Sequence, residues 1–148
     1  MQREVVMKHK GAISQVYRKR DEVIVPQIFA KAKQLSSYPT TMERLFKIAA
    51  DIPVDQHYLS DDTAILYIHN RIFRGINKIH RSPHKQRLFE SLYQIVCEML
   101  NDGRYKSYEL NNITILALQR PAPCIGLSPT VIWQKYWQLK NKKRHAKV

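Results

Sequence analysis

The sequence predicts a mainly α-helical protein, a compact bundle of about six or seven helices within a single domain over residues 1–148. Apolar residues recur at helical spacing in several segments, and Ser, Thr or Pro stands where most of these segments begin. Hydrophobic residues make up 44% and charged residues 25% of the chain, as in ordinary globular proteins. These observations exclude a fibrous or largely disordered chain.

The first third of the chain predicts three helical segments. Residues 4–20 carry an apolar side, and a further apolar face continues to about residue 36. A break or a restart of the helix is expected near residues 21–25, because Pro26 is tolerated only in the first turn of a helix. Thr41 is a suitable N-cap for a short helix that ends before Pro53.

A long amphipathic helix is predicted over residues 61–81. Ser60 is its expected N-cap, and two aspartates in the first turn suit the positive end of the helix dipole. Its apolar stripe consists of Ile65, Ile68, Ile72, Ile76 and Ile79. Four basic residues fall within about 80° of one another on a face turned away from these isoleucines. They are Arg71, Arg74, Lys78 and Arg81.

The second half of the chain predicts another set of helices. Ser82 and Pro83 open a helix with a wide apolar face, which Gly103 closes. Residues 105–118 fit either a short helix or a β-branched strand. Ser128 opens the last helix, which continues into a basic tail at residues 140–148.

An internal repeat favours the helical interpretation of residues 105–118. An offset of 68 residues aligns residues 48–53 with residues 116–121, and it aligns Ser60 with Ser128. The copies would span residues 21–81 and 82–148, giving two three-helix units whose third helices are both basic. Few residues are identical between the copies, so a chance match is the alternative.

The net charge of +13 is concentrated in two segments. Six Lys and Arg residues and no acid lie between Asp62 and Glu90, and seven bases and no acid follow Glu109. Such segments predict contact with a polyanion, whereas a solvated outer face is the alternative. The candidate phosphate contacts are Arg71, Arg74, Lys78, Arg81, Lys135, Lys142, Lys143 and Arg144, and the candidate base contacts are Asn70 and Asn77.

These features predict a small basic nucleic-acid-binding protein that contacts the phosphates of duplex DNA more readily than RNA. The alternative is a non-enzymatic interaction module that binds an acidic protein; the oligomeric state is left open. Trp133, Tyr136 and Trp137 suit either base stacking or a core, and their helical spacing favours the core.

No catalytic, metal or cofactor site is predicted. Ser82 and Pro83 break the helix between His80 and His84, so these histidines do not share a helical face. The glycines form no phosphate-binding loop. Without an apolar span or signal peptide, the sequence predicts a cytoplasmic protein that does not enter membranes.

Two segments resemble known proteins. Residues 41–81 resemble the helix-turn-helix family in outline, although their connecting segment is longer than that family's turn and lacks glycine. Residues 121–128, Pro-Ala-Pro-Cys-Ile-Gly-Leu-Ser, are similar to the Pro-x-Pro, apolar and Ser segment that precedes a helix in small uncharacterised Bacteroidetes proteins. The first resemblance implies DNA binding, and the second implies no known activity.

Overall fold

The structure is a computed structural model of the chain, and it describes residues 14–36, 40–76 and 80–146. The described residues are mainly helical and contain no β-strand, which confirms the predicted fold class. The elements are α2 (Gln15–Lys19), the π-helix η1 (Arg20–Ile24), α3 (Val25–Leu35), α4 (Met42–Ala50), α5 (Asp61–Phe73), α6 (Pro83–Leu100), the 3-10 helix η2 (Gly103–Tyr105), α7 (Leu110–Leu118) and α8 (Pro129–Ala146).

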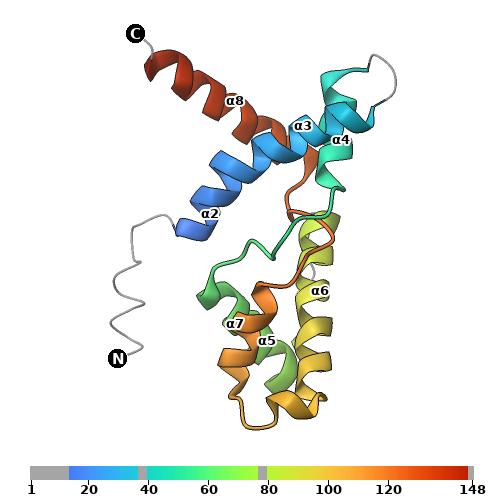
Figure 1. The fold of residues 1–148 in the computed structure, drawn as a ribbon, viewed down its shortest axis with the longest axis vertical. Coiled ribbons are helices and arrows are strands. Elements are labelled where there is room, and N and C mark those ends of the chain that lie inside the picture. The colour runs from blue at the N-terminus through green and yellow to red at the C-terminus, as the bar shows by residue number, and fades with distance from the viewer. Residues whose placement is uncertain (1–13, 37–39, 77–79, 147–148) are drawn as a thin grey trace.

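The helices form two lobes (Figure 1). Each half of the chain contributes its third helix, α5 or α8, to the lobe that the other half builds. The first lobe contains α2, η1, α3, α4 and α8, and the second contains α5, α6 and α7. The chain leaves the first lobe after α4, builds the whole second lobe, and returns to the first with α8. Residues 51–60 and 119–128, here named the crossing segments, connect the two lobes.

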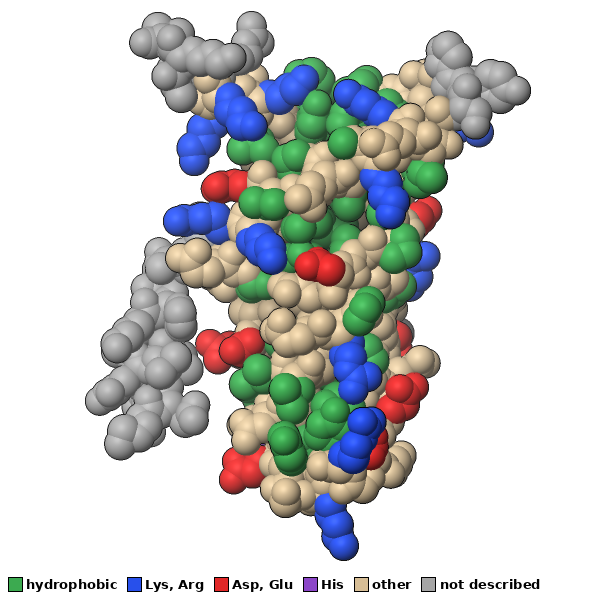
Figure 2. All heavy atoms as spheres, in the orientation of Figure 1, with side chains coloured by type: hydrophobic (Ala, Val, Ile, Leu, Met, Phe, Trp, Pro, Cys, Tyr) green, Lys and Arg blue, Asp and Glu red, His purple; other side chains and the backbone are tan. Residues whose placement is uncertain are grey.

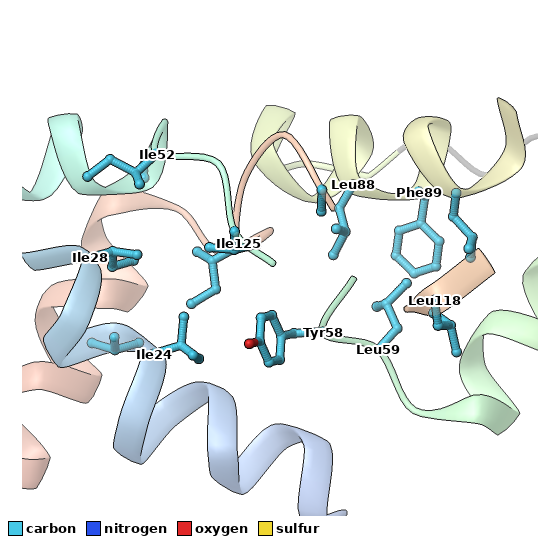
Figure 3. Close-up of a cluster of buried hydrophobic side chains, with 14 of the residues drawn as sticks. Ile24, Ile28, Ile52, Tyr58, Leu59, Leu88, Phe89, Leu118 and Ile125 are labelled. Atoms are coloured by element: carbon cyan, nitrogen blue, oxygen red, sulfur yellow. The ribbon is translucent and has the colours of Figure 1, made fainter. Parts of the chain in front are cut away.

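The crossing segments pair with each other and join the two lobes into one core. The backbone N–H groups of Val54 and Ala122 each donate to the other residue's carbonyl oxygen at 3.0 Å. Figure 3 shows side chains of the crossing segments lying between isoleucines of the first lobe and apolar side chains of α6 and α7 in the second. The buried side chains that fill this junction are Tyr58, Leu59 and Ile125.

The helices of the two halves begin at positions that differ by a constant 68 residues, the offset found in the sequence. The residues preceding these helices pair as Ser14 with Ser82, Thr41 with Glu109, and Ser60 with Ser128. Helices α4 and α7 are each nine residues long. The correspondence begins at Ser14, not at residue 21 as expected from the sequence.

The β-bridge follows the same offset, since it joins Val54 to Ala122. An antiparallel contact between equivalent residues is the arrangement that a twofold axis produces in a symmetric dimer. Buried positions also match, including Ala49 with Ala117 on α4 and α7. The common origin of the two halves stays a prediction.

Of two predicted helix boundaries, one is confirmed in part and the other is wrong. The helix does not break near residues 21–25, because the π-helix η1 carries it from α2 into α3, but the expected restart is present, since α3 begins at Val25 with Pro26 in its first turn. Helix α5 ends at Phe73 and does not reach residue 81. Gly75 follows with a φ of +65°, a left-handed conformation that terminates helices.

The undecided segment at residues 105–118 forms α7 over its last nine residues, so the helical interpretation is confirmed. The isoleucine stripe is only partly in the core. Ile68 is fully buried and Ile72 is partly buried, whereas Ile76 lies exposed beyond the end of α5. Ile79 lies outside the described residues.

Candidate nucleic-acid interface

Arg71 is part of the internal packing of the second lobe. Its Nη1 donates to Oε1 of Glu90 at 2.6 Å and to the hydroxyl of Tyr67 at 2.7 Å. Its guanidinium lies 3.9 Å from the ring centroid of Tyr93, and only 18% of the side chain is exposed. The charge of Arg71 therefore joins α5 to α6, and its expected role in phosphate binding stays a prediction.

Replacing Arg71 with Gln should lower the free energy of unfolding by about 1–3 kcal/mol, because Glu90 would lose its charged partner in a partly buried site. Urea unfolding at neutral pH measures the loss. The exposed neighbour Arg74 provides the control, and Arg74→Gln should change stability by less than about 0.5 kcal/mol. Equal losses in the two variants would contradict the structural role of Arg71.

Arg74 and Arg81, the other members of the predicted basic stripe that the structure describes, do not share a helix face. Arg74 caps the C-terminus of α5, while Arg81 is exposed in the segment before α6. Lys78 and Asn77 lie outside the described residues. Asn70 is half-buried near the end of α5, where its backbone carbonyl oxygen accepts hydrogen bonds from the backbone N–H groups of Arg74 and Ile76. Because α5 ends early, the predicted stripe is not formed.

Helix α8 divides its basic residues between two environments. Lys135 donates to Oδ2 of Asp21 at 2.9 Å, an ion pair that fastens α8 to η1. Lys142 is exposed beside the same acidic segment. Lys143 is exposed on the side of α8 that faces α3. The backbone of Arg144 lies within α8, and its side chain is outside the described part of the structure.

The first lobe carries most of the excess charge. The sequence of its two parts, residues 14–50 and 129–146, contains twelve Lys and Arg but three Asp and Glu. The second lobe, residues 61–118, has eight Lys and Arg against six Asp and Glu. Figure 2 shows Lys and Arg side chains gathered over the first lobe, with hydrophobic side chains between them. The basic segment between Asp62 and Glu90 therefore belongs to a lobe that is nearly neutral as a whole.

A cleft of about 260 Å³ lies between α3 and α8 within this basic lobe. Three lysines border it, and no carboxylate from the described residues lines it. The lining residues of this α3–α8 cleft are Pro26, Phe29, Ala30 and Lys33 from α3, and Tyr136, Leu139, Lys140 and Lys143 from α8.

Aromatic side chains form the floor and one side of the α3–α8 cleft. The ring centroids of Phe29 and Tyr136 are 4.4 Å apart, and Tyr136 also packs edge-on against Phe46. The ammonium group of Lys33 lies 4.8 Å from the Phe29 centroid, and that of Lys140 lies 5.1 Å from the Tyr136 centroid. The ammonium groups of these two exposed lysines thus lie over aromatic rings of the cleft, at a distance typical of cation–π contacts.

The two tryptophans differ from the expectation that they belong to the core. Trp133 is 49% exposed and Trp137 is 40% exposed. Helix α8 instead packs onto the first lobe through Ile132, which is fully buried, and through the partly buried Tyr136. The core expectation holds in part for Tyr136 and is wrong for both tryptophans.

Lys33 was missed in the sequence, and Lys140 appeared only as the start of the basic tail. Lys33 is preceded by neither a basic run nor a motif, and 107 positions separate it from Lys140. The two meet because α8 packs against α3. Only the exposed polar face of α3 hinted at a surface role for Lys33.

Other functional chemistry finds little support in the described parts of the chain. They contain no group of three or more His, Cys, Asp and Glu side chains suited to a metal ion. His84 lies 2.9 Å from Oδ1 of Asp51, and both Cys97 and Cys124 are free thiols. None of the described helices combines the length and apolar character needed to span a bilayer.

Comparison with known proteins adds no relative: no family model, curated protein or solved structure matches the chain.

Proposed function

We propose that the chain is a nucleic-acid-binding protein that contacts phosphates through Lys33, Lys140 and Lys143. The observation that supports this proposal is the convergence of these three lysines around one cleft without a lining carboxylate. They lie in the lobe with four times as many bases as acids. A lysine ammonium is a compact cation that suits phosphate oxygens, and phosphate contacts supply most sequence-independent affinity.

The second lobe offers a weaker footprint for a polyanion. Its acidic residues nearly balance its bases, and Arg71 is bound to Glu90. Arg104 is likewise paired, since its Nη2 lies 2.7 Å from Oδ2 of Asp102. A phosphate approaching this lobe would compete with carboxylates already in place.

The proposal is tested by measuring the salt dependence of binding to a labelled DNA duplex. Replacing Lys33, Lys140 and Lys143 together with Gln should flatten the slope of log affinity against log salt by about 2–3. Affinity should fall for unrelated sequences alike, because phosphate contacts carry no sequence information. Unfolding free energy should change little, since these side chains lie at the surface.

The matched control removes three exposed positive charges from the second lobe, by changing Arg74, Arg81 and Lys106 to Gln. This control includes two residues of the stripe predicted from the sequence. For this control variant, the slope of log affinity against log salt should differ from that of the unaltered chain by less than about 1. If the two triple variants lose the same slope, binding reflects total charge alone, and the α3–α8 cleft is not the site. If the unaltered chain binds neither the duplex nor its separated strands, the proposed function is wrong.

A further inference from the structure

We infer that the α3–α8 cleft and the adjoining face of α8 bind single-stranded nucleic acid, with bases stacking on Trp133 and Trp137. This inference rests on the proposed function, because the same lysines would hold the phosphates. It adds the class of nucleic acid and assigns a role to the two exposed tryptophans.

The two tryptophans lie at successive turns of α8, with lysines beyond the second of them. Trp133 and Trp137 are one turn of α8 apart, about 6 Å along the helix axis. The Nζ atom of Lys140 lies 5.7 Å from the centroid of Trp137, and Lys143 follows on the wall of the cleft. Charged side chains that follow a backbone beside aromatic rings are typical of single-strand binding sites.

Internal packing does not account for the outer surfaces of the tryptophan rings. The ring of Trp133 stacks against Phe46 of the core, with the two centroids 6.4 Å apart. Trp137 meets Tyr136 edge-on, with centroids 5.9 Å apart. Both side chains leave 40% or more of their area in water, although tryptophan is usually well buried in folded proteins.

Charge identifies the occupant of this face. A second copy docking here would bring Lys33, Lys140 and Lys143 of two chains together, and like charges at an interface oppose association. An unpaired strand instead supplies both negative phosphates and free base faces. The bases of a duplex are already stacked on one another, so a duplex can use the lysines but not the rings.

Intrinsic fluorescence tests the inference in the unaltered protein, because Trp133 and Trp137 are the only tryptophans in the chain. An oligothymidylate of about 12 nucleotides should quench the emission as it binds. The same strand paired with its complement, and an abasic strand of equal length, should bind through their phosphates without that quenching. An oligouridylate shows whether the site distinguishes RNA from DNA.

Substitutions separate stacking from charge. Changing both tryptophans to Leu should weaken single-strand binding by about 5- to 150-fold for each ring on which a base stacks, and leave duplex binding unchanged. The control is Phe73→Leu, which removes an exposed aromatic side chain from the other lobe. Urea unfolding of each variant confirms that the fold persists.

The outcomes distinguish this inference from the proposed function. If the lysine variant loses affinity but the Trp→Leu variant loses none, the phosphate site stands and the stacking inference is overturned. Equal quenching by the duplex and the single strand also overturns it. If the lysine variant binds every probe as the unaltered chain does, both proposals fail.

Discussion

Replacing Ile68 with Ala should lower the free energy of unfolding by about 2–5 kcal/mol. Ile68 has no exposed surface, and it lies on the side of α5 that faces the core of the second lobe. The substitution removes buried methyl and methylene groups and leaves a cavity that the surrounding helices fill only partly. Urea unfolding followed by circular dichroism measures the loss.

Leu66→Ala is the matched control on the same helix. Leu66 lies two positions earlier, with 63% of its surface exposed, so the same kind of truncation removes little buried area. Its expected cost is about 0.5 kcal/mol or less. Similar losses in the two variants would show that α5 is not oriented as the structure has it.

Gly126→Ala should destabilise the protein by about 2–5 kcal/mol, because two costs add at this position. Gly126 has a φ of +86°, which an L side chain rarely adopts. A Cβ atom at this residue would also lie 2.5 Å from Cδ2 of Leu88, a side chain that is itself buried. Either the buried Leu88 side chain or the crossing segment would have to shift.

Gly75→Ala measures the cost of the positive φ without a steric clash. Gly75 also has a positive φ, +65°, but a Cβ atom there would meet nothing within 4 Å. Its expected cost is about 1–2 kcal/mol, from backbone strain alone. Thermal or urea unfolding of both variants gives the difference that the contact with Leu88 accounts for. A larger loss at Gly75 than at Gly126 would contradict the packing of the crossing segment against Leu88.

Local signals were sufficient to predict most of the helices. Thr41, Ser60 and Ser82 each accept a hydrogen bond from a backbone N–H three residues later, as expected for N-caps. The end of α5 was missed because the isoleucine spacing continues past Phe73. Gly75 was the available signal, since glycine just beyond a helix favours termination.

The candidate site depended on information that periodicity does not contain. Basic residues close in sequence were grouped into one surface, but the structure pairs Arg71 with Glu90 and Lys135 with Asp21. Lys33 and Lys140 become neighbours only through the packing of α8 on α3. Net charge predicted the chemistry of the partner, and only the three-dimensional arrangement indicated a surface for it. Nucleic-acid binding stays a prediction.

The exchange of third helices makes the order of synthesis matter for the first lobe. Helices α3 and α4 leave the ribosome early, yet 78 residues separate the end of α4 from the start of α8, the helix that covers them. Throughout that interval Phe29 and Phe46 lack the aromatic cover that Tyr136 later supplies. The second lobe, in contrast, consists of one uninterrupted stretch of chain. A nascent chain can therefore complete its second lobe before its first, and the α3–α8 cleft forms only when α8 docks.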